Sequence, residues 1–110
     1  MKLPSTIRFF DDDTKKAFYK LEKGDNSEKE MFRLMEQAMD NIEKNAFCGI
    51  QLPKRLIPED YAKKGIKNLW KYDLPRGWRL VYSIVNEELI IVSIVLEWFD
   101  HKGYEKRFKY

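Results

Sequence analysis

The sequence predicts one α+β domain spanning residues 1–110, in which an N-terminal strand and two helices pack on an antiparallel sheet and a short C-terminal helix follows. Two patterns lead to this prediction. Apolar residues recur at helical spacing in the first half, whereas runs of β-branched and aromatic residues occupy 78–85 and 89–98. With 110 residues, 44% hydrophobic and 35% charged, the chain is long enough for one hydrophobic core but not for two.

The chain is expected to begin with an edge strand over Ile7–Phe10, followed by a helix over Lys15–Lys23. Asp13 or Thr14 would cap this helix, because short polar side chains satisfy the first backbone N–H groups. Gly24 would end it.

A second, longer helix is expected to start at Ser27, which forms a capping box with Glu30, and to stop at Gly49. Its apolar residues recur at helical spacing: Met31, Leu34, Met35, Ala38 and Ile42. The methionines of this helix could also line a partner-binding groove, but a stripe of apolar residues at helical spacing usually belongs to the core. Cys48, near the end of this helix, is expected to be a small buried residue without a chemical role.

The middle of the chain is expected to be extended over Ile50–Ile57 and then to form a short basic helix over Pro58–Lys64. Proline suits the first turn of a helix, and Gly65 lies just past its end.

The second half of the chain predicts a three-stranded meander. Its strands are 68–73, 78–85 and 89–98, and the polar loop 86–88 joins the last two. The segment 74–77 has proline second and glycine fourth, which favours a type I turn. The strand 89–98 is apolar on both faces, so both faces are expected to be covered.

Several classes of protein are disfavoured by composition. No apolar run is long enough to span a bilayer, and the first residues lack the apolar segment of a signal peptide, so a cytoplasmic protein without membrane contact is expected. One cysteine, Cys48, and one histidine, His101, leave no internal disulfide and no pair of imidazoles for a metal. We therefore expect no metal and no cofactor.

Positive charge is concentrated in the second half of the chain. Residues 1–49 contain 9 Lys/Arg and 10 Asp/Glu, whereas residues 50–110 contain 12 and 8. The basic residues alternate with Trp70, Tyr72, Trp78, Tyr104 and Phe108. Cations for phosphates and flat rings for bases are what a single-stranded nucleic acid requires, although such charge often marks only a solvated face.

The last third of the chain resembles the RelE/ParE toxin superfamily of toxin–antitoxin modules, and RelE-like archaeal proteins in particular. The resemblance rests on Gly77-Trp-Arg-Leu-Val-Tyr82, the Asn86-Glu87 turn, the apolar strand after it and His101-Lys-Gly-Tyr104, and it is clearest over 69–108. Relative to compact members of the family, the helix at 58–65 looks like an insertion.

The resemblance implies a RelE-like fold and a toxin that cuts mRNA on the ribosome without metal, by driving a ribose 2′-hydroxyl onto the adjacent phosphate. A cognate antitoxin normally neutralises such a toxin by wrapping it. Arg79 matches the arginine that contacts the scissile phosphate in active members, and Tyr104 falls near the family's C-terminal catalytic tyrosine. The ribosome, mRNA and an antitoxin are therefore the expected partners.

Cleavage of this kind needs a group that takes the 2′-hydroxyl proton, cations for the phosphate charge and an acid for the leaving oxygen. His101 is the best candidate for proton transfer, because an imidazole changes charge near neutral pH. If Asp100 caps a last helix, Glu105 lies four residues beyond His101 and can orient its ring. The candidate phosphate-binding residues are Lys71, Arg76, Lys102 and Arg107.

Simpler roles remain open for these residues. Tyr104 and Phe108 can pack the last helix on the sheet while His101 lies on the surface, and Arg79 can pair with Glu97 across the hairpin. The sequence has one lysine, Lys71, where potent members carry a pair. Two alternatives to the nuclease follow: a ParE-like inhibitor of a protein target such as gyrase, and an inactive RelE-fold domain that binds RNA or protein.

Overall fold

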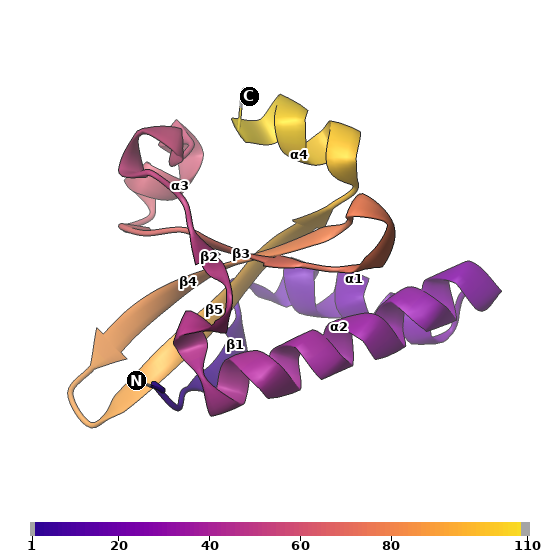
Figure 1. Ribbon diagram of the computed structural model, residues 1–110, viewed down its shortest axis with the longest axis horizontal. Helices are drawn as coiled ribbons and strands as arrows, with labels where there is room; N and C mark the ends of the chain where they lie inside the picture. Colours follow the sequence, from indigo (N-terminus) through magenta and orange to yellow (C-terminus); the bar gives the residue numbers. More distant parts are fainter. Residues whose placement is uncertain (1, 109–110) are drawn as a thin grey trace.

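The computed structural model describes residues 2–108 as an α+β domain in which a five-stranded sheet has helices on both faces (Figure 1). The strands are β1 (Thr6–Phe9), β2 (Ile50–Gln51), β3 (Trp70–Asp73), β4 (Arg79–Glu87) and β5 (Ile90–Phe99). The α-helices are α1 (Asp12–Glu22), α2 (Asn26–Lys44), α3 (Glu59–Lys63) and α4 (His101–Phe108). Short 3₁₀ helices are η1 (Ala46–Cys48), η2 (Lys54–Leu56) and η3 (Pro75–Gly77).

The sheet has the strand order β1-β5-β4-β3-β2. β1 lies at the edge, as predicted, but it runs parallel to β5, with Thr6 opposite Val92 and Phe9 opposite Val95. The expectation of a purely antiparallel sheet is therefore wrong. Only consecutive strands joined by tight turns are constrained to be antiparallel, and the helices after β1 remove that constraint.

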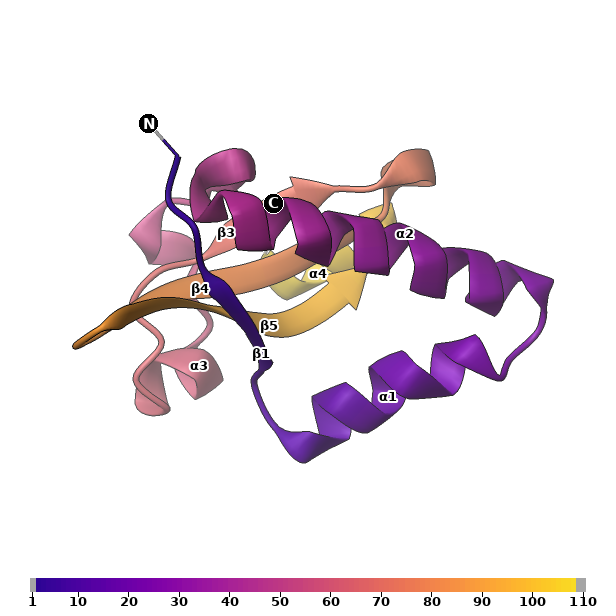
Figure 2. The ribbon, with the colours of Figure 1, turned by 90° about the horizontal axis from the view of Figure 1, so that it is seen from below.

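Two hydrophobic clusters cover the two faces of the sheet. Below the sheet in Figure 1, α1 and α2 pack on one face, and Figure 2 shows this helix pair in front of the strands. On the opposite face, α3 and α4 pack around Leu69, Val81 and Leu96. The prediction that both faces of the last strand are covered is confirmed.

The start of α1 differs from the sequence-based prediction. Asp11 caps the helix, because its carboxylate accepts hydrogen bonds from the backbone N–H of Thr14 at 2.8 Å and from the Thr14 hydroxyl at 2.6 Å. The predicted cap at Asp13 or Thr14 is wrong. Three consecutive aspartates offer several caps, and the earliest gives the longest helix.

A capping box starts α2, as predicted, but it lies two residues earlier in the chain. Asp25 accepts a hydrogen bond from the N–H of Glu28 at 2.9 Å, and the Glu28 carboxylate accepts one from the N–H of Asp25 at 3.3 Å. The predicted Ser27–Glu30 box is therefore wrong. Of the predicted stripe, Met35, Ala38 and Ile42 are buried, and Met31 and Leu34 are partly buried against the same core. Phe32 and Met39, which were not predicted, are buried as well.

The turns of the meander also differ from prediction. Arg76 and Gly77 have φ angles of 62° and 79°, which define a type I′ turn, because a type I turn has negative φ at both central positions. A type I′ turn matches the twist of the strands that it joins. Glu88 and Leu89 form the β4–β5 turn, because Glu87 pairs with Ile90. The predicted loop at 86–88 is therefore wrong, since Asn86 and Glu87 belong to β4.

Between α2 and β3 the chain is only partly extended, because β2 has two residues and η2 follows it. The predicted short helix is confirmed as α3, and Gly65 ends it with a φ of 84°. Cys48 is exposed, contrary to prediction, because it lies in η1 after the main helix has ended.

Tyr82 on β4 connects η1 and the residue after it to the sheet through two hydrogen bonds. Its buried hydroxyl donates to the carbonyl oxygen of Ala46 at 2.6 Å and accepts from the N–H of Gly49 at 3.1 Å. Burial raises the pKa of Tyr82 well above its ordinary value. A side chain at Gly49 would lie 2.5 Å from the carbonyl oxygen of Lys71, so this close approach requires glycine.

Replacing Tyr82 by phenylalanine is expected to lower the free energy of unfolding by about 1–3 kcal/mol, because the buried carbonyl of Ala46 and the partly buried N–H of Gly49 lose their partner. Urea denaturation measures this. Tyr72→Phe is the matched control: Tyr72 accepts a hydrogen bond from the side chain of Asn41 at an exposed position, where water replaces the lost group. Equal destabilisation by the two substitutions would contradict this account of Tyr82.

Candidate functional site

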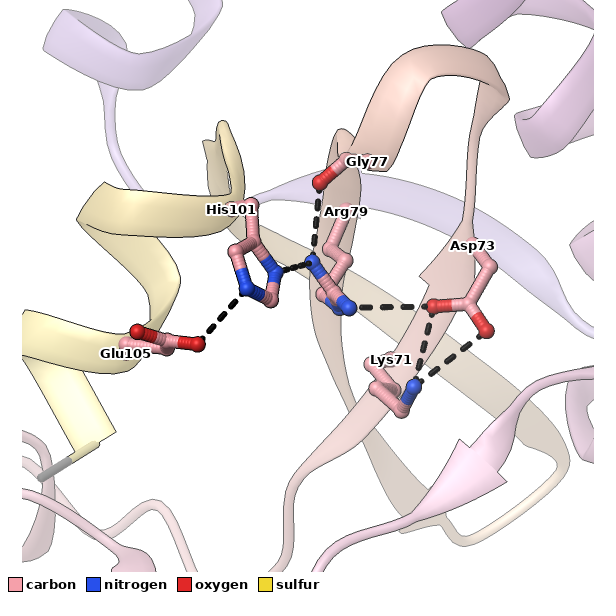
Figure 3. A network of polar contacts seen from close by, with 6 residues as sticks. All are labelled: Lys71, Asp73, Gly77, Arg79, His101 and Glu105. Atoms are coloured by element: carbon pink, nitrogen blue, oxygen red, sulfur yellow. Dashed lines mark hydrogen bonds and ion pairs between the residues drawn. The ribbon is translucent and has the colours of Figure 1, made fainter. Parts of the chain in front are cut away.

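Polar residues from β3, β4 and α4 meet at one end of the sheet (Figure 3). Arg79 is the first residue of β4 and follows the type I′ turn directly. It pairs with Asp73 of β3 and with Phe99 of β5, so the start of α4 at His101 lies beside it. Lys71 lies two residues before Asp73, on the same face of β3.

Contacts on several sides fix the guanidinium group of Arg79. Its Nη1 donates to the carbonyl oxygen of Gly77 at 2.8 Å and lies 3.3 Å from Nδ1 of His101. Its Nε lies 3.6 Å from a carboxylate oxygen of Asp73. The guanidinium also stacks over the ring of Tyr104, 4.7 Å from the ring centre. These contacts hold a permanent positive charge in one orientation while 18% of the side chain remains exposed.

The same contacts define the protonation of His101. Arginine only donates hydrogen bonds, so Nδ1 of His101 must accept the bond from Arg79. Nε2 then carries the proton and donates a hydrogen bond to Glu105, whose carboxylate oxygen is 2.6 Å away. This tautomer is assigned from the hydrogen-bond network. The predicted pairing of Glu105 with His101 is confirmed, and it leaves Nδ1 as the basic atom beside the guanidinium.

The start of α4 is fixed as the sequence predicts. Asp100 caps the helix, because its carboxylate accepts a hydrogen bond from the N–H of Gly103 at 2.7 Å. His101 is exposed at the first position of the helix, where its ring can meet both Arg79 and Glu105.

Tyr104 is buried, with 3% of its surface exposed, and packs beside Phe108 with the ring centres 4.9 Å apart. The packing role that the sequence left open for these two residues is confirmed. The structure thus places the predicted catalytic Tyr104 beneath Arg79, with its hydroxyl buried and its ring as a support for the guanidinium.

This position of Tyr104 predicts different results for two substitutions. Tyr104→Phe keeps the ring beneath Arg79 and is expected to keep most of the activity proposed below. Tyr104→Leu removes a cation–π contact of about 1–2 kcal/mol and is expected to lower that activity by about 5–30-fold. Cleavage rates of purified variants measure both. A loss as large in Tyr104→Phe as in Tyr104→Leu would instead assign a role to the hydroxyl.

The other predicted cations lie in different surroundings. Lys71 belongs to the site, because its ammonium group contacts both carboxylate oxygens of Asp73, at 3.0 and 3.2 Å. Arg76 is highly exposed and pairs with Glu30 of α2 at 3.1 Å, away from Arg79. Lys102 is exposed on α4.

Arg107 joins α4 to α3. It donates two hydrogen bonds to Asp60, at 2.8 and 3.1 Å, and a third to Glu97 at 3.3 Å, and it stacks over the ring of Tyr61. These bonds to Arg107 lower the pKa of Asp60 and raise that of Arg107. Glu97 therefore pairs with Arg107, and the alternative Arg79–Glu97 pair is wrong.

Sequence reasoning missed two groups of the site, the carboxylate of Asp73 and the carbonyl oxygen of Gly77. The spacing of Lys71 and Asp73 was the available signal for the carboxylate, because residues two apart on a strand share a face. The carbonyl of Gly77 points at Arg79 because of the type I′ turn, which the sequence did not predict.

Within residues 2–108, no group of three or more His, Cys, Asp or Glu side chains is arranged to hold a metal ion. None of the helices in this part of the chain is long and apolar enough to cross a membrane. Comparisons of the chain with protein-family models, curated proteins and solved structures find no significant match.

Proposed function

We propose that this protein is a RelE-like toxin of a type II toxin–antitoxin module and acts as a metal-independent, ribosome-dependent mRNA endonuclease. The observation that carries this proposal is the Arg79–His101 pair. The guanidinium donates to Nδ1 of His101 at 3.3 Å, and the opposite ring nitrogen donates to a carboxylate. A phosphate that takes over this guanidinium N–H would free the lone pair of Nδ1 and lie next to a base.

The arrangement can perform the cleavage in one displacement. Arg79 would bind the non-bridging oxygens of the scissile phosphate. The hydrogen bond from Arg79 to Nδ1 of His101 would break as Nδ1 takes the proton from the 2′-hydroxyl. The 2′ oxygen then bonds to phosphorus, the bond from phosphorus to the 5′ oxygen breaks, and water protonates the leaving oxygen. Glu105 would stabilise the imidazolium that forms, as a carboxylate does behind a catalytic histidine.

The arrangement of elements also supports the proposal. The described chain runs strand, two helices, meander and final helix, which is the layout that the resemblance implies. The α3 segment would be an addition that anchors α4, through Arg107 and Asp60, and so indirectly holds His101 beside Arg79. The proposed partners are the ribosome with its mRNA and a cognate antitoxin, and the proposed location is the cytoplasm, where translation occurs.

The burial of Tyr104 favours a second candidate, a RelE-fold domain that binds RNA or a protein target without cleaving RNA. Such a domain would retain the cations of the site but would lack an accessible tyrosine. A ParE-like inhibitor of a protein target belongs to this second class.

Inducible expression in bacteria tests the proposed function against the second candidate. We expect growth arrest together with truncated mRNA and intact DNA. Growth arrest with full-length mRNA and damaged DNA would support a ParE-like inhibitor instead. The absence of arrest, together with RNA binding by the purified protein, would support a binding domain.

A further inference from the structure

The carboxylate of Asp73 lies between the two cations of the site (Figure 3). It contacts the ammonium group of Lys71 at 3.0 and 3.2 Å and lies 3.6 Å from Nε of Arg79. Both cationic side chains are 18% exposed, whereas that of Asp73 is 53% exposed. An anion of the protein itself therefore occupies the place between the charges to which a phosphate would bind.

We propose that Asp73 is a tethered occupant of the phosphate site, which an RNA phosphate must displace from Lys71 and Arg79. The inference rests on the proposed function in one respect, namely that the ligand of these cations is an RNA phosphate. A tethered carboxylate competes at a high effective concentration, so a small free anion displaces it poorly. An RNA strand is held at several phosphates and overcomes this competition.

The position of Asp73 permits such a displacement. Asp73 is the last residue of β3 and precedes the type I′ turn, so its exposed side chain can rotate into solvent. Arg79 keeps its contacts with Gly77, His101 and Tyr104 when the carboxylate leaves. The guanidinium thus stays in its orientation, and its charge becomes available to the ligand.

Binding of a single-stranded 2′-O-methyl RNA oligonucleotide to Asp73→Asn tests the inference. Asparagine keeps the size of the side chain and an acceptor oxygen but removes the charge. We expect binding at low salt to be about fivefold tighter than in the wild type, or more, because a charge within about 4 Å of the ligand is lost. The slope of log affinity against log salt should steepen by about 0.7, the value for one added phosphate contact with a single strand.

Two further variants serve as controls. Glu87→Gln removes the same charge at the other end of β4, where Glu87 pairs with the exposed Arg8, and should change binding little. Asp73→Glu keeps the charge and should give no gain. If Asp73→Asn is destabilised in thermal unfolding, Asp73→Ser at the same exposed position provides the uncharged variant.

Equal or weaker binding by the uncharged variants, including no binding by any form of the protein, would overturn the inference. An equal gain in Glu87→Gln would also overturn the inference, because the tighter binding would then follow from the net charge of the protein and not from the position of Asp73. The oligonucleotide cannot be cleaved, since its 2′ oxygens are methylated. Tighter binding without any cleavage of ribosomal mRNA would therefore contradict the proposed function and leave this inference intact.

Discussion

Arg79→Gln is expected to lower the rate of mRNA cleavage by about 10²–10³-fold, the usual cost of removing one preorganised group that stabilises the transition-state charge. Arg79 offers two parallel N–H donors in an orientation fixed by Gly77, His101 and Tyr104. Glutamine keeps a polar side chain but has neither the charge nor the planar fork. Single-turnover cleavage on purified ribosomes measures the effect.

Arg8→Gln is the matched control for this experiment. Arg8 is an exposed arginine of β1 that pairs with Glu87 at 3.4 Å, far along β4 from Arg79. We expect Arg8→Gln to cleave at the wild-type rate. Arg79→Lys should recover only part of the activity, because lysine has the charge but not the bidentate geometry. Full activity of Arg79→Gln would show that Arg79 does not take part in cleavage.

His101→Gln is expected to lower cleavage by about 10²–10⁴-fold, the range for the loss of a general base. Glutamine can accept a hydrogen bond from Arg79, but it cannot take a proton from the 2′-hydroxyl. Single-turnover cleavage by the two proteins on purified ribosomes measures this loss.

Glu105→Gln distinguishes the contribution of His101 as the base from that of Glu105, which orients its ring. Glu105 accepts a hydrogen bond from Nε2 of His101 at 2.6 Å and so holds the tautomer of the ring. We expect a smaller loss than in His101→Gln. Lys106→Gln on the same helix is the control and should leave the rate unchanged. A His101→Gln protein that cleaves normally would show that another group takes the proton.

The strands that position the site could be predicted from local patterns. Runs of β-branched and aromatic residues predicted strands at 78–85 and 89–98, and the structure has β4 and β5 there, with Leu80 and Tyr82 on one face of the sheet and Val81 on the other. Asp100 as a cap and Glu105 behind His101 followed from helical spacing alone. These features depend on residues close together in the sequence, for which the period of a strand or helix determines which side chains meet.

Other features depend on competition between local alternatives or on distant contacts. The consecutive aspartates at positions 11–13 offered similar caps for α1, and the structure shows that Asp11 is the one used. The depth at which Tyr104 lies depends on how α4 packs on β5, and a pair 47 residues apart, Asp60 and Arg107, helps to set that position. The positive φ of Arg76 is equally unexpected, because non-glycine residues rarely adopt it.

Mapping the 5′ ends of mRNA on purified ribosomes tests the central claim most directly. Ribosomes stalled on a defined mRNA would be incubated with wild-type protein, Arg79→Gln or Arg8→Gln, and the ends located by primer extension. We predict ends at one fixed position within the codon for the wild type and Arg8→Gln, none for Arg79→Gln, and none without ribosomes. Intact mRNA with the wild-type protein, or the same ends with Arg79→Gln, would contradict the account.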